Sequence, residues 1–140
     1  MGLKLFIFDE NYSPNLAKGL EHLENGNIKS PHRANITHIN TLAKKQGTPD
    51  EEVIEIAGKN NGIIITKDAD FKKIKHYYSL YKTHNAGVVY FKPQNGKSTY
   101  WDEVNTFIKE WERIKAFIAN DKPPFAYQIS KNSNCIKLEF

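Results

Sequence analysis

Short apolar runs alternate along the chain with amphipathic patterns of helical spacing, and this alternation restricts the fold more than any other sequence feature. The apolar runs cover residues 3–8, 35–39, 63–66 and 86–91. They are too short for helices, so they predict strands, and the β-branched run 63–66 has the composition of a buried one. One helical pattern begins at Ser13-Pro14, with Leu16, Leu20 and Leu23 expected on its buried face. A second begins at Thr48-Pro49, and a third covers residues 69–80. This order predicts right-handed crossovers and an α/β fold, with a mainly parallel sheet covered on both faces.

The C-terminal part of the chain has the pattern of a long helix followed by a hairpin. Residues 101–119 repeat apolar side chains at spacings of three and four. Residues 125–129 and 135–140 flank a polar stretch, which predicts a β-hairpin. No repeat or linker interrupts the sequence. We therefore expect one domain over residues 1–140, with a core at 1–92 and a C-terminal extension at 97–140.

Composition excludes several classes of protein. Cys135 is the only cysteine, so the chain forms neither an internal disulfide nor a cysteine-rich zinc site. The apolar runs fall far short of the roughly 20 residues that cross a bilayer. The N-terminus also lacks the pattern of a signal peptide, so we expect a cytoplasmic protein without membrane contact.

The net charge of +4 permits a polyanionic partner. Of the 20 basic residues, 18 are lysines. Lysine attracts phosphates by charge, whereas arginine reads a base or phosphate through two hydrogen bonds at once. A nucleic acid would therefore be bound mainly through its backbone.

Acidic residues gather where the predicted strands end. They form three groups: Asp9 and Glu10, then Asp50, Glu51 and Glu52, and finally Asp68 and Asp70. The first group follows the first strand, the third follows the isoleucine-rich strand, and the second begins the helix that leads into that strand. Because parallel strands bring their C-terminal ends to one edge of a sheet, we expect the first and third groups to converge there. The second group reaches that edge only if its loop brings it.

Carboxylates held close together repel one another unless a cation compensates their charge. Mg²⁺ and Mn²⁺ prefer oxygen ligands, and Mg²⁺ is bound through one or two carboxylates and the phosphates of a substrate. In phosphodiester hydrolysis such an ion activates the attacking water and neutralises charge on the phosphate. Four nearby lysines would attract the flanking phosphates of RNA: Lys67, Lys72, Lys73 and Lys75.

Helix capping is an alternative role for some of these acids. Thr48 and Glu51 fit a capping box, in which Asp50 would complement the helix dipole. Asp68 would cap a helix that begins at the next residue. Asp9 has no such alternative, because Ser13 is the better cap for the helix that follows it. The argument for a functional acid is therefore strongest at Asp9.

Three blocks of the sequence stand in a fixed order: Phe-Asp-Glu-Asn-Tyr-Ser-Pro from residue 8, Gly-Thr-Pro-Asp-Glu-Glu-Val-Ile-Glu-Ile-Ala from residue 47, and Ile-Ile-Thr-Lys-Asp-Ala-Asp-Phe from residue 64. In this order and at these separations they resemble PIN-domain ribonucleases. The closest similarity is to the short PIN-like group that resembles VapC toxins of bacterial and archaeal toxin–antitoxin pairs. The resemblance covers residues 3 to 91.

The resemblance implies a three-layer α/β/α sandwich and a metal-dependent endoribonuclease site that uses Mg²⁺ or Mn²⁺. It implies catalytic and metal-binding acids, with Glu10 and Glu52 as further metal ligands beside Asp9, Asp50, Asp68 and Asp70. It also implies an RNA substrate, an antitoxin partner and a possible homodimer. The C-terminal helix and hairpin lie outside the resemblance. They would either complete the sheet or form the surface for a dimer or an antitoxin.

Two other functions fit part of the sequence. The first is a catalytically silent PIN-like module that binds RNA or a protein partner through its lysines. A nuclease would cleave RNA in a metal-dependent reaction, whereas the silent module would not. The second is a phospho-receiver domain, because Asp9-Glu10 and Lys92-Pro93 imitate the acid pair and the Lys-Pro step of a receiver. A receiver also needs an acceptor aspartate at the end of a central strand, where this chain has the start of a helix.

Overall fold

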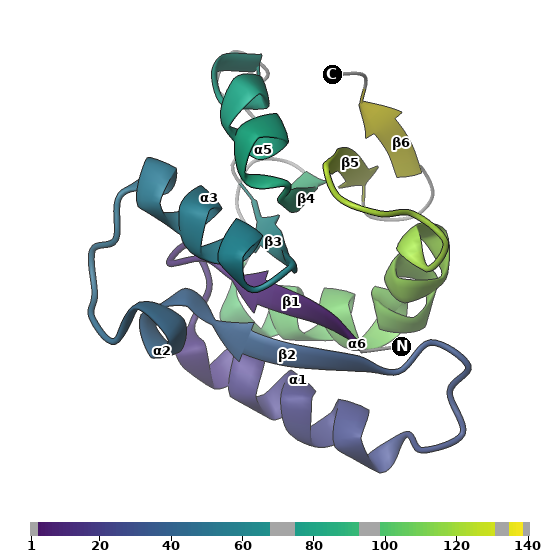
Figure 1. The fold of residues 1–140 in the computed structure, drawn as a ribbon. Helices are drawn as coiled ribbons and strands as arrows, with labels where there is room; N and C mark the ends of the chain where they lie inside the picture. The colour runs from purple at the N-terminus through teal and green to yellow at the C-terminus, as the bar shows by residue number, and fades with distance from the viewer. Residues whose placement is uncertain (1–2, 68–74, 93–98, 131–134, 139–140) are drawn as a thin grey trace.

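The computed structural model describes residues 3–67, 75–92, 99–130 and 135–138, and within them the chain forms one six-stranded sheet of order β2-β1-β3-β4-β5-β6 (Figure 1). All neighbouring strands pair in parallel except β5 and β6, which are antiparallel. The strands are β1 (Lys4–Phe8), β2 (Ala34–His38), β3 (Gly62–Thr66), β4 (Gly87–Lys92), β5 (Phe125–Ser130) and β6 (Cys135–Leu138). The mainly parallel α/β sheet and the C-terminal hairpin are confirmed.

Helices cover both faces of the sheet. The described helices are α1 (Pro14–Gly26), α2 (Ile39–Ala43), α3 (Asp50–Lys59), α5 (Tyr78–His84) and α6 (Tyr100–Ile118). One core cluster packs α1 and α6 against one face, and a second packs α2, α3 and α5 against the other. The three-layer arrangement therefore agrees with the predicted sandwich.

The two core clusters follow from the alternation of side chains along each strand. In β1, Phe6 and Phe8 point to the α1–α6 side, whereas Ile7 points to the α3 side. On the first side the ring of Phe107 in α6 lies 5.0 Å from that of Phe8 and 4.8 Å from that of Phe91, measured between centroids. A strand buried on both faces is apolar at every position, which is why β1 and β3 are continuous apolar runs.

Helix α1 begins at Pro14 after the N-cap Ser13, as predicted. Its buried apolar face is shorter than predicted, because it does not extend to the last turn. The Ser13 side chain accepts a hydrogen bond from the backbone of Asn15, and Pro14 occupies the first turn. Leu16 and Leu20 are buried, but Leu23 is 58% exposed. The inward position in the last turn belongs to Glu24, which bonds to α6. Predicting Leu23 on the buried face was therefore wrong.

The capping box predicted before α3 does not form. The N-cap is Pro49, and it makes no side-chain capping bond within the described residues. The Thr48 hydroxyl is buried there without a hydrogen-bond partner. The backbone N–H groups of Gly47 and Thr48 instead donate to the carboxylate of Glu10, which follows β1. Glu10 therefore accepts the backbone N–H of Thr48, which Glu51 would accept in the predicted capping box.

The remaining helices differ from the prediction in their ends. The helix predicted over residues 69–80 overlaps α5, which continues to His84, while residues 68–74 lie outside the described part of the chain. The five-residue α2 was not predicted. The long C-terminal helix is confirmed as α6, and Thr99 and Asp102 form a capping box at its start. No helix among the described residues has the length and hydropathy that crossing a membrane requires.

Candidate active site

The candidate site lies at the point where the strand order reverses. β1 is flanked by β2 on one side and by β3 on the other, and β4 lies beyond β3. The chain leaves β1 for α1 on one face and leaves β3 for α5 on the opposite face. The helices that follow these two strands therefore lie on opposite faces, and a pocket lies at the C-terminal ends of β1 and β3, where ligands bind in sheets of this kind.

Asp9 is fixed in this pocket by its neighbours. Its backbone N–H donates to the carbonyl of Ile65 at 3.1 Å, which extends the pairing of β1 with β3. Its carboxylate accepts the backbone N–H of Asn11 at 3.0 Å and the side-chain amide of Asn11 at 3.3 Å. The same amide lies 3.4 Å from the hydroxyl of Thr66 at the end of β3. Asn11 therefore joins the ends of the two strands and fixes the orientation of Asp9.

The environment of Asp9 disfavours its ionised form. Burial raises the pKa of Asp9 above its ordinary value, and the charge of Asp50 adds to the rise. Hydrogen bonds from Thr66 and Asn11 oppose the rise without cancelling it. A desolvated carboxylate beside a second carboxylate is a costly arrangement that a bound cation would relieve.

The two carboxylates share a small pocket of about 40 Å³. Its lining includes Asp9, Asp50 and Thr66 and also three tyrosines: Tyr77 at the start of α5, Tyr81 in α5 and Tyr90 in β4. The Tyr77 hydroxyl donates to Asp50 at 3.5 Å, and the hydroxyls of Tyr81 and Tyr90 are 2.7 Å apart. This space holds a few water molecules or one ion with part of its hydration shell. The loop before α3 therefore brings Asp50, from the second group of acids, to the same site as Asp9.

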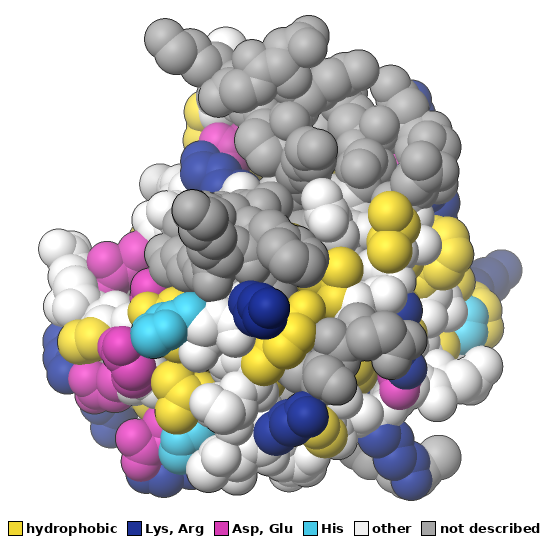
Figure 2. All heavy atoms as spheres, turned by 90° about the horizontal axis from the view of Figure 1, so that it is seen from above, with side chains coloured by type: hydrophobic (Ala, Val, Ile, Leu, Met, Phe, Trp, Pro, Cys, Tyr) yellow, Lys and Arg dark blue, Asp and Glu magenta, His cyan; other side chains and the backbone are white. Residues whose placement is uncertain are grey.

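Glu10 and Glu52 have other partners. Glu10 accepts the backbone N–H groups of the loop before α3, and Glu52 forms an ion pair with Lys45 at 3.0 Å. Figure 2 shows acidic side chains gathered on its left, the side on which α3 lies in Figure 1, and α3 carries three acids in its first turn. Lysine and arginine side chains are spread across the same face.

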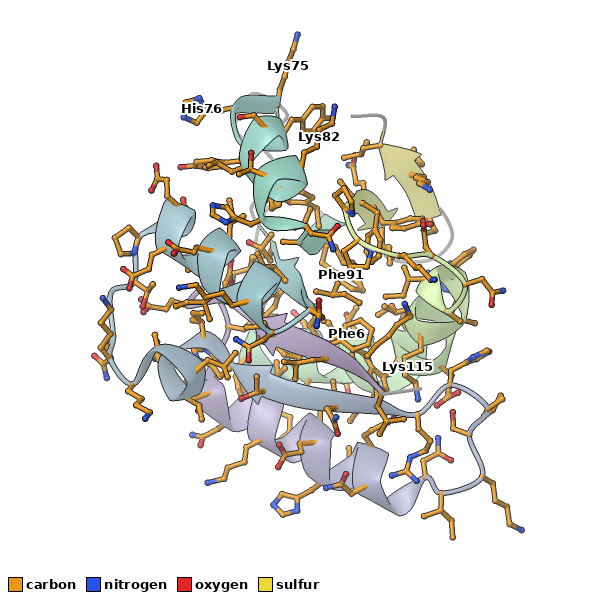
Figure 3. The ribbon with its side chains drawn as sticks, in the orientation of Figure 1. Phe6, Lys75, His76, Lys82, Phe91 and Lys115 are labelled. Atoms are coloured by element: carbon orange, nitrogen blue, oxygen red, sulfur yellow. The ribbon has the colours of Figure 1, made fainter. Side chains whose placement is uncertain are left out.

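The third acid group and two of the predicted RNA-binding lysines lie outside the described residues: Asp68, Asp70, Lys72 and Lys73. Lys67 is described, and its ammonium lies 3.3 Å from Glu103 of α6 and 5.3 Å from the ring centroid of Tyr12. Lys75 is exposed and points away from the body of the molecule, as Figure 3 shows at the outer end of the α5 region.

The donors of the pocket suit a hard divalent ion. Within the described ranges, no three acids, histidines or cysteines lie close enough together to form a complete metal site. The pocket offers two carboxylates and the Thr66 hydroxyl, which are all oxygen donors. Mg²⁺ is commonly held by only one or two carboxylates and keeps its other positions for water and phosphate, so this donor set fits Mg²⁺ and Mn²⁺.

Sequence reasoning missed the residues that support Asp9. Asn11 lies two positions after Asp9, which is the spacing of a turn in which an aspartate side chain accepts the N–H two residues on. That local signal was available. The contributions of Thr66 and Tyr77 had no local signal, because they depend on the pairing of β1 with β3 and on the packing of the α5 region against α3.

Comparison with known proteins gives one result. A family model described as "PIN like domain" matches residues 5–93, which is more than half of the chain. The match starts in β1 and ends just after β4, so it contains the whole candidate site and stops before α6 and the C-terminal hairpin. No curated protein and no solved structure matches the chain.

Proposed function

The chain belongs to the PIN-like domain family, and from this premise we propose that it is a metal-dependent endoribonuclease that hydrolyses phosphodiester bonds of cytoplasmic RNA. The observation that carries the proposal is the position of Asp9. It is a desolvated carboxylate at the reversal point of the sheet, held by Asn11, with Asp50 on the wall of the same pocket. Perturbed acids in a crevice at the strand ends mark functional sites more often than structural ones.

Asp9 and Asp50 would hold the ion, with Asp68 and Asp70 as further proposed ligands. When bound, the ion supplies a Lewis acid that neutralises phosphate charge and lowers the pKa of water. The protein orients Asp9 through Asn11 and narrows the pocket with the tyrosines. The lysines attract the flanking phosphates. Lys67 forms an ion pair with Glu103, so it would have to break this ion pair in order to bind a phosphate.

We expect the purified chain to cut a mixed pool of single-stranded and structured RNA in Mg²⁺ or Mn²⁺ and to leave it intact in chelator. Gel analysis of the products over time measures this, and adding back the metal to the chelated sample controls for loss of protein. A pool that stays intact in both metals would favour the silent module. Cleavage that continues in chelator would show that the reaction does not need a metal ion, and the proposed metal dependence would then be wrong.

A groove between α1 and α6 favours a protein partner, as a toxin held by an antitoxin would require. The groove measures about 320 Å³, and its lining includes four side chains that are 43–69% exposed: Leu23, Tyr100, Trp101 and Ile108. Gly19 also lines it, and a Cβ atom added there would meet no atom of the described residues within 4 Å. A groove with exposed apolar side chains between two helices suits an apolar segment of a partner. We propose an apolar segment of the antitoxin as the occupant.

The Gly19→Leu variant tests this surface. We expect it to fold and to gain roughly 0.5–1 kcal/mol of stability from helix propensity, while filling the groove. Inhibition of RNA cleavage by the proposed antitoxin should weaken at least tenfold. Gly26→Leu is the matched control, because that glycine is equally open but does not line the groove. Equal inhibition of both variants would place the antitoxin elsewhere, and loss of a dimer in sedimentation would assign the groove to a second copy.

A further inference from the structure

A second pocket lies at the opposite end of the sheet from Asp9. Its volume is about 360 Å³, and it is bounded by the start of β1, the segment that leads into β2 and the last turns of α6. Asp9 follows the C-terminal end of β1, whereas Lys4 stands at its N-terminal end and lines this pocket. Figure 3 shows Phe6 of β1 and Lys115 of α6, which both line it, close to each other. The proposed nuclease chemistry uses none of these residues.

The polar lining of this pocket is basic. It consists of Lys4, His32, Arg33 and Lys115, and the described lining contains no carboxylate. Lys115 is neutralised, because its ammonium lies 2.7 Å from Glu24 and 2.7 Å from Glu112. Lys4 donates to the backbone carbonyl of Asp121 at 2.7 Å, which satisfies a hydrogen bond but supplies no full counter-charge. The positive charge left in the pocket is therefore that of Arg33 and of Lys4, and burial lowers the pKa of Lys4 while the charge of Asp121 partly opposes that fall.

Arg33 is the group that most needs a partner. Its Nε is buried and has no hydrogen-bond acceptor among the described residues. The nearby acids of α6 and its C-terminal loop are occupied. Glu112 accepts from Asn27, Ser30 and Lys115, and Asp121 accepts from Tyr127 and pairs with Lys137. A buried donor without an acceptor is unfavourable. This nitrogen is itself closed to a ligand, but Arg33 is only half-buried and lines the pocket, so its charge is available there to an acceptor from outside the chain.

The geometry of guanidinium defines that acceptor. Arginine presents planar, parallel N–H donors that match the two oxygens of a carboxylate or phosphate. The rest of the lining is mainly apolar and includes Phe6, which is buried, and Leu3, which is 51% exposed. Pockets that bind small molecules have volumes of this order and combine apolar walls with a few polar groups. The complementary ligand thus has one oxyanion and an apolar body.

We propose that this pocket binds a small organic oxyanion, with the anionic group on Arg33 between Lys4 and His32 and the apolar body against Leu3 and Phe6. The site is independent of the proposed nuclease site, because it requires neither a metal ion nor Asp9. Phosphate monoesters and carboxylates share the chemistry that the pocket selects, and the two arms of the test distinguish them.

The test is isothermal titration of the whole chain in metal-free buffer at pH 7 with four probes. Phenyl phosphate and benzoate carry both an oxyanion and an apolar ring, inorganic phosphate lacks the ring, and benzyl alcohol lacks the charge. We expect saturable binding at one site for phenyl phosphate or benzoate, and the tighter of the two identifies the oxyanion. Inorganic phosphate and benzyl alcohol should each bind at least tenfold more weakly. If neither aromatic anion binds, or if benzyl alcohol binds equally well, the proposal is wrong.

Variants locate the binding. Arg33→Met retains the apolar stem and removes the donors, so affinity should fall at least tenfold, and Arg33→Lys should fall in between because it keeps the charge alone. Lys29→Met is the matched control, since this exposed lysine precedes β2 but does not line the pocket. Circular dichroism checks that each variant is folded. Equal losses of affinity in Arg33→Met and Lys29→Met would show that binding depends only on the net charge of the protein and not on this pocket. Binding that survives in Asp9→Asn separates this site from the proposed nuclease.

Discussion

Asp9→Asn should reduce metal-dependent RNA cleavage by about 100-fold or more, because losing a group that only orients a metal ligand already costs roughly 10–100-fold. Asparagine has nearly the same size and accepts the N–H of Asn11 through its carbonyl oxygen, so the turn after β1 is kept. What it lacks is the negative charge that would hold the ion. The measurement is initial cleavage rate in Mg²⁺ and in Mn²⁺, with the variant purified in parallel with the wild type.

The same variant should be at least as stable as the wild type, and the pH dependence shows why. Burial raises the pKa of Asp9 in the folded state above its unfolded value. Between these two pKa values the folded chain binds more protons than the unfolded chain, so this group makes stability fall as pH rises. Above the folded pKa the full cost of the buried charge remains. Asn cannot ionise, so its thermal midpoint at pH 7 in metal-free buffer should equal or exceed that of the wild type.

A matched control is Glu55→Gln, which removes one charge from an exposed i,i+4 pair with Lys59 on α3. Such pairs contribute little to stability, and this one does not line the pocket. Glu55→Gln should therefore cleave RNA at the rate of the wild type and have the same thermal unfolding midpoint. A midpoint for Asp9→Asn several degrees below that of the wild type would show a structural role instead. Undiminished cleavage by Asp9→Asn would place the active site away from the pocket.

Lys115→Met should be the most destabilising of these substitutions, by roughly 3–5 kcal/mol, because it leaves a buried carboxylate without its counter-charge. Glu24 is 1% exposed and Lys115 is 2% exposed in their side chains, and they are 2.7 Å apart. Glu24 also accepts from the backbone of Ala34 at 2.8 Å and from the indole of Trp111 at 3.2 Å. These contacts hold α1, β2 and α6 together. Urea unfolding at pH 7 should show a lower midpoint.

The Glu24→Gln/Lys115→Met double variant provides the check on that mechanism. Neutral glutamine accepts from either Ala34 or Trp111 through its single amide oxygen, so one of these two hydrogen bonds is lost, but no charge is left buried. The double variant should therefore be more stable than Lys115→Met alone, and the two single effects should not add. Strict additivity would show that Lys115 contributes through packing of its stem, and the ion pair would then have no special role.

Sequence reasoning succeeded where the signal is local. Ser13-Pro14 identified the start of α1, and the isoleucines before Thr66 identified a strand buried on both faces. It failed where an inward position is polar, because no apolar period reveals that Glu24 faces α6 in place of Leu23. It also failed before α3, where the backbone N–H of Thr48 is accepted by Glu10, 38 residues away, and not by Glu51 as a capping box would require.

The candidate site could be predicted in the same uneven way. The topology of parallel strands brought Asp9 to the right edge of the sheet without knowledge of any contact. That Asp50 reaches the pocket is set by the loop before α3, which the sequence could not place. The functional role of Asp68 and Asp70 remains a prediction from the resemblance, because these residues lie outside the described ranges.

The pair Asp9-Glu10 divides two duties between adjacent carboxylates. Glu10 binds the loop that delivers α3, and through it sets the position of Asp50 relative to Asp9. Glu10 therefore has a structural role, and Asp9 has the catalytic role under the proposed function. On that proposal, a relative that keeps the acid at the position of Glu10 but has lost the acid at the position of Asp9 should keep the fold and lack metal-dependent cleavage.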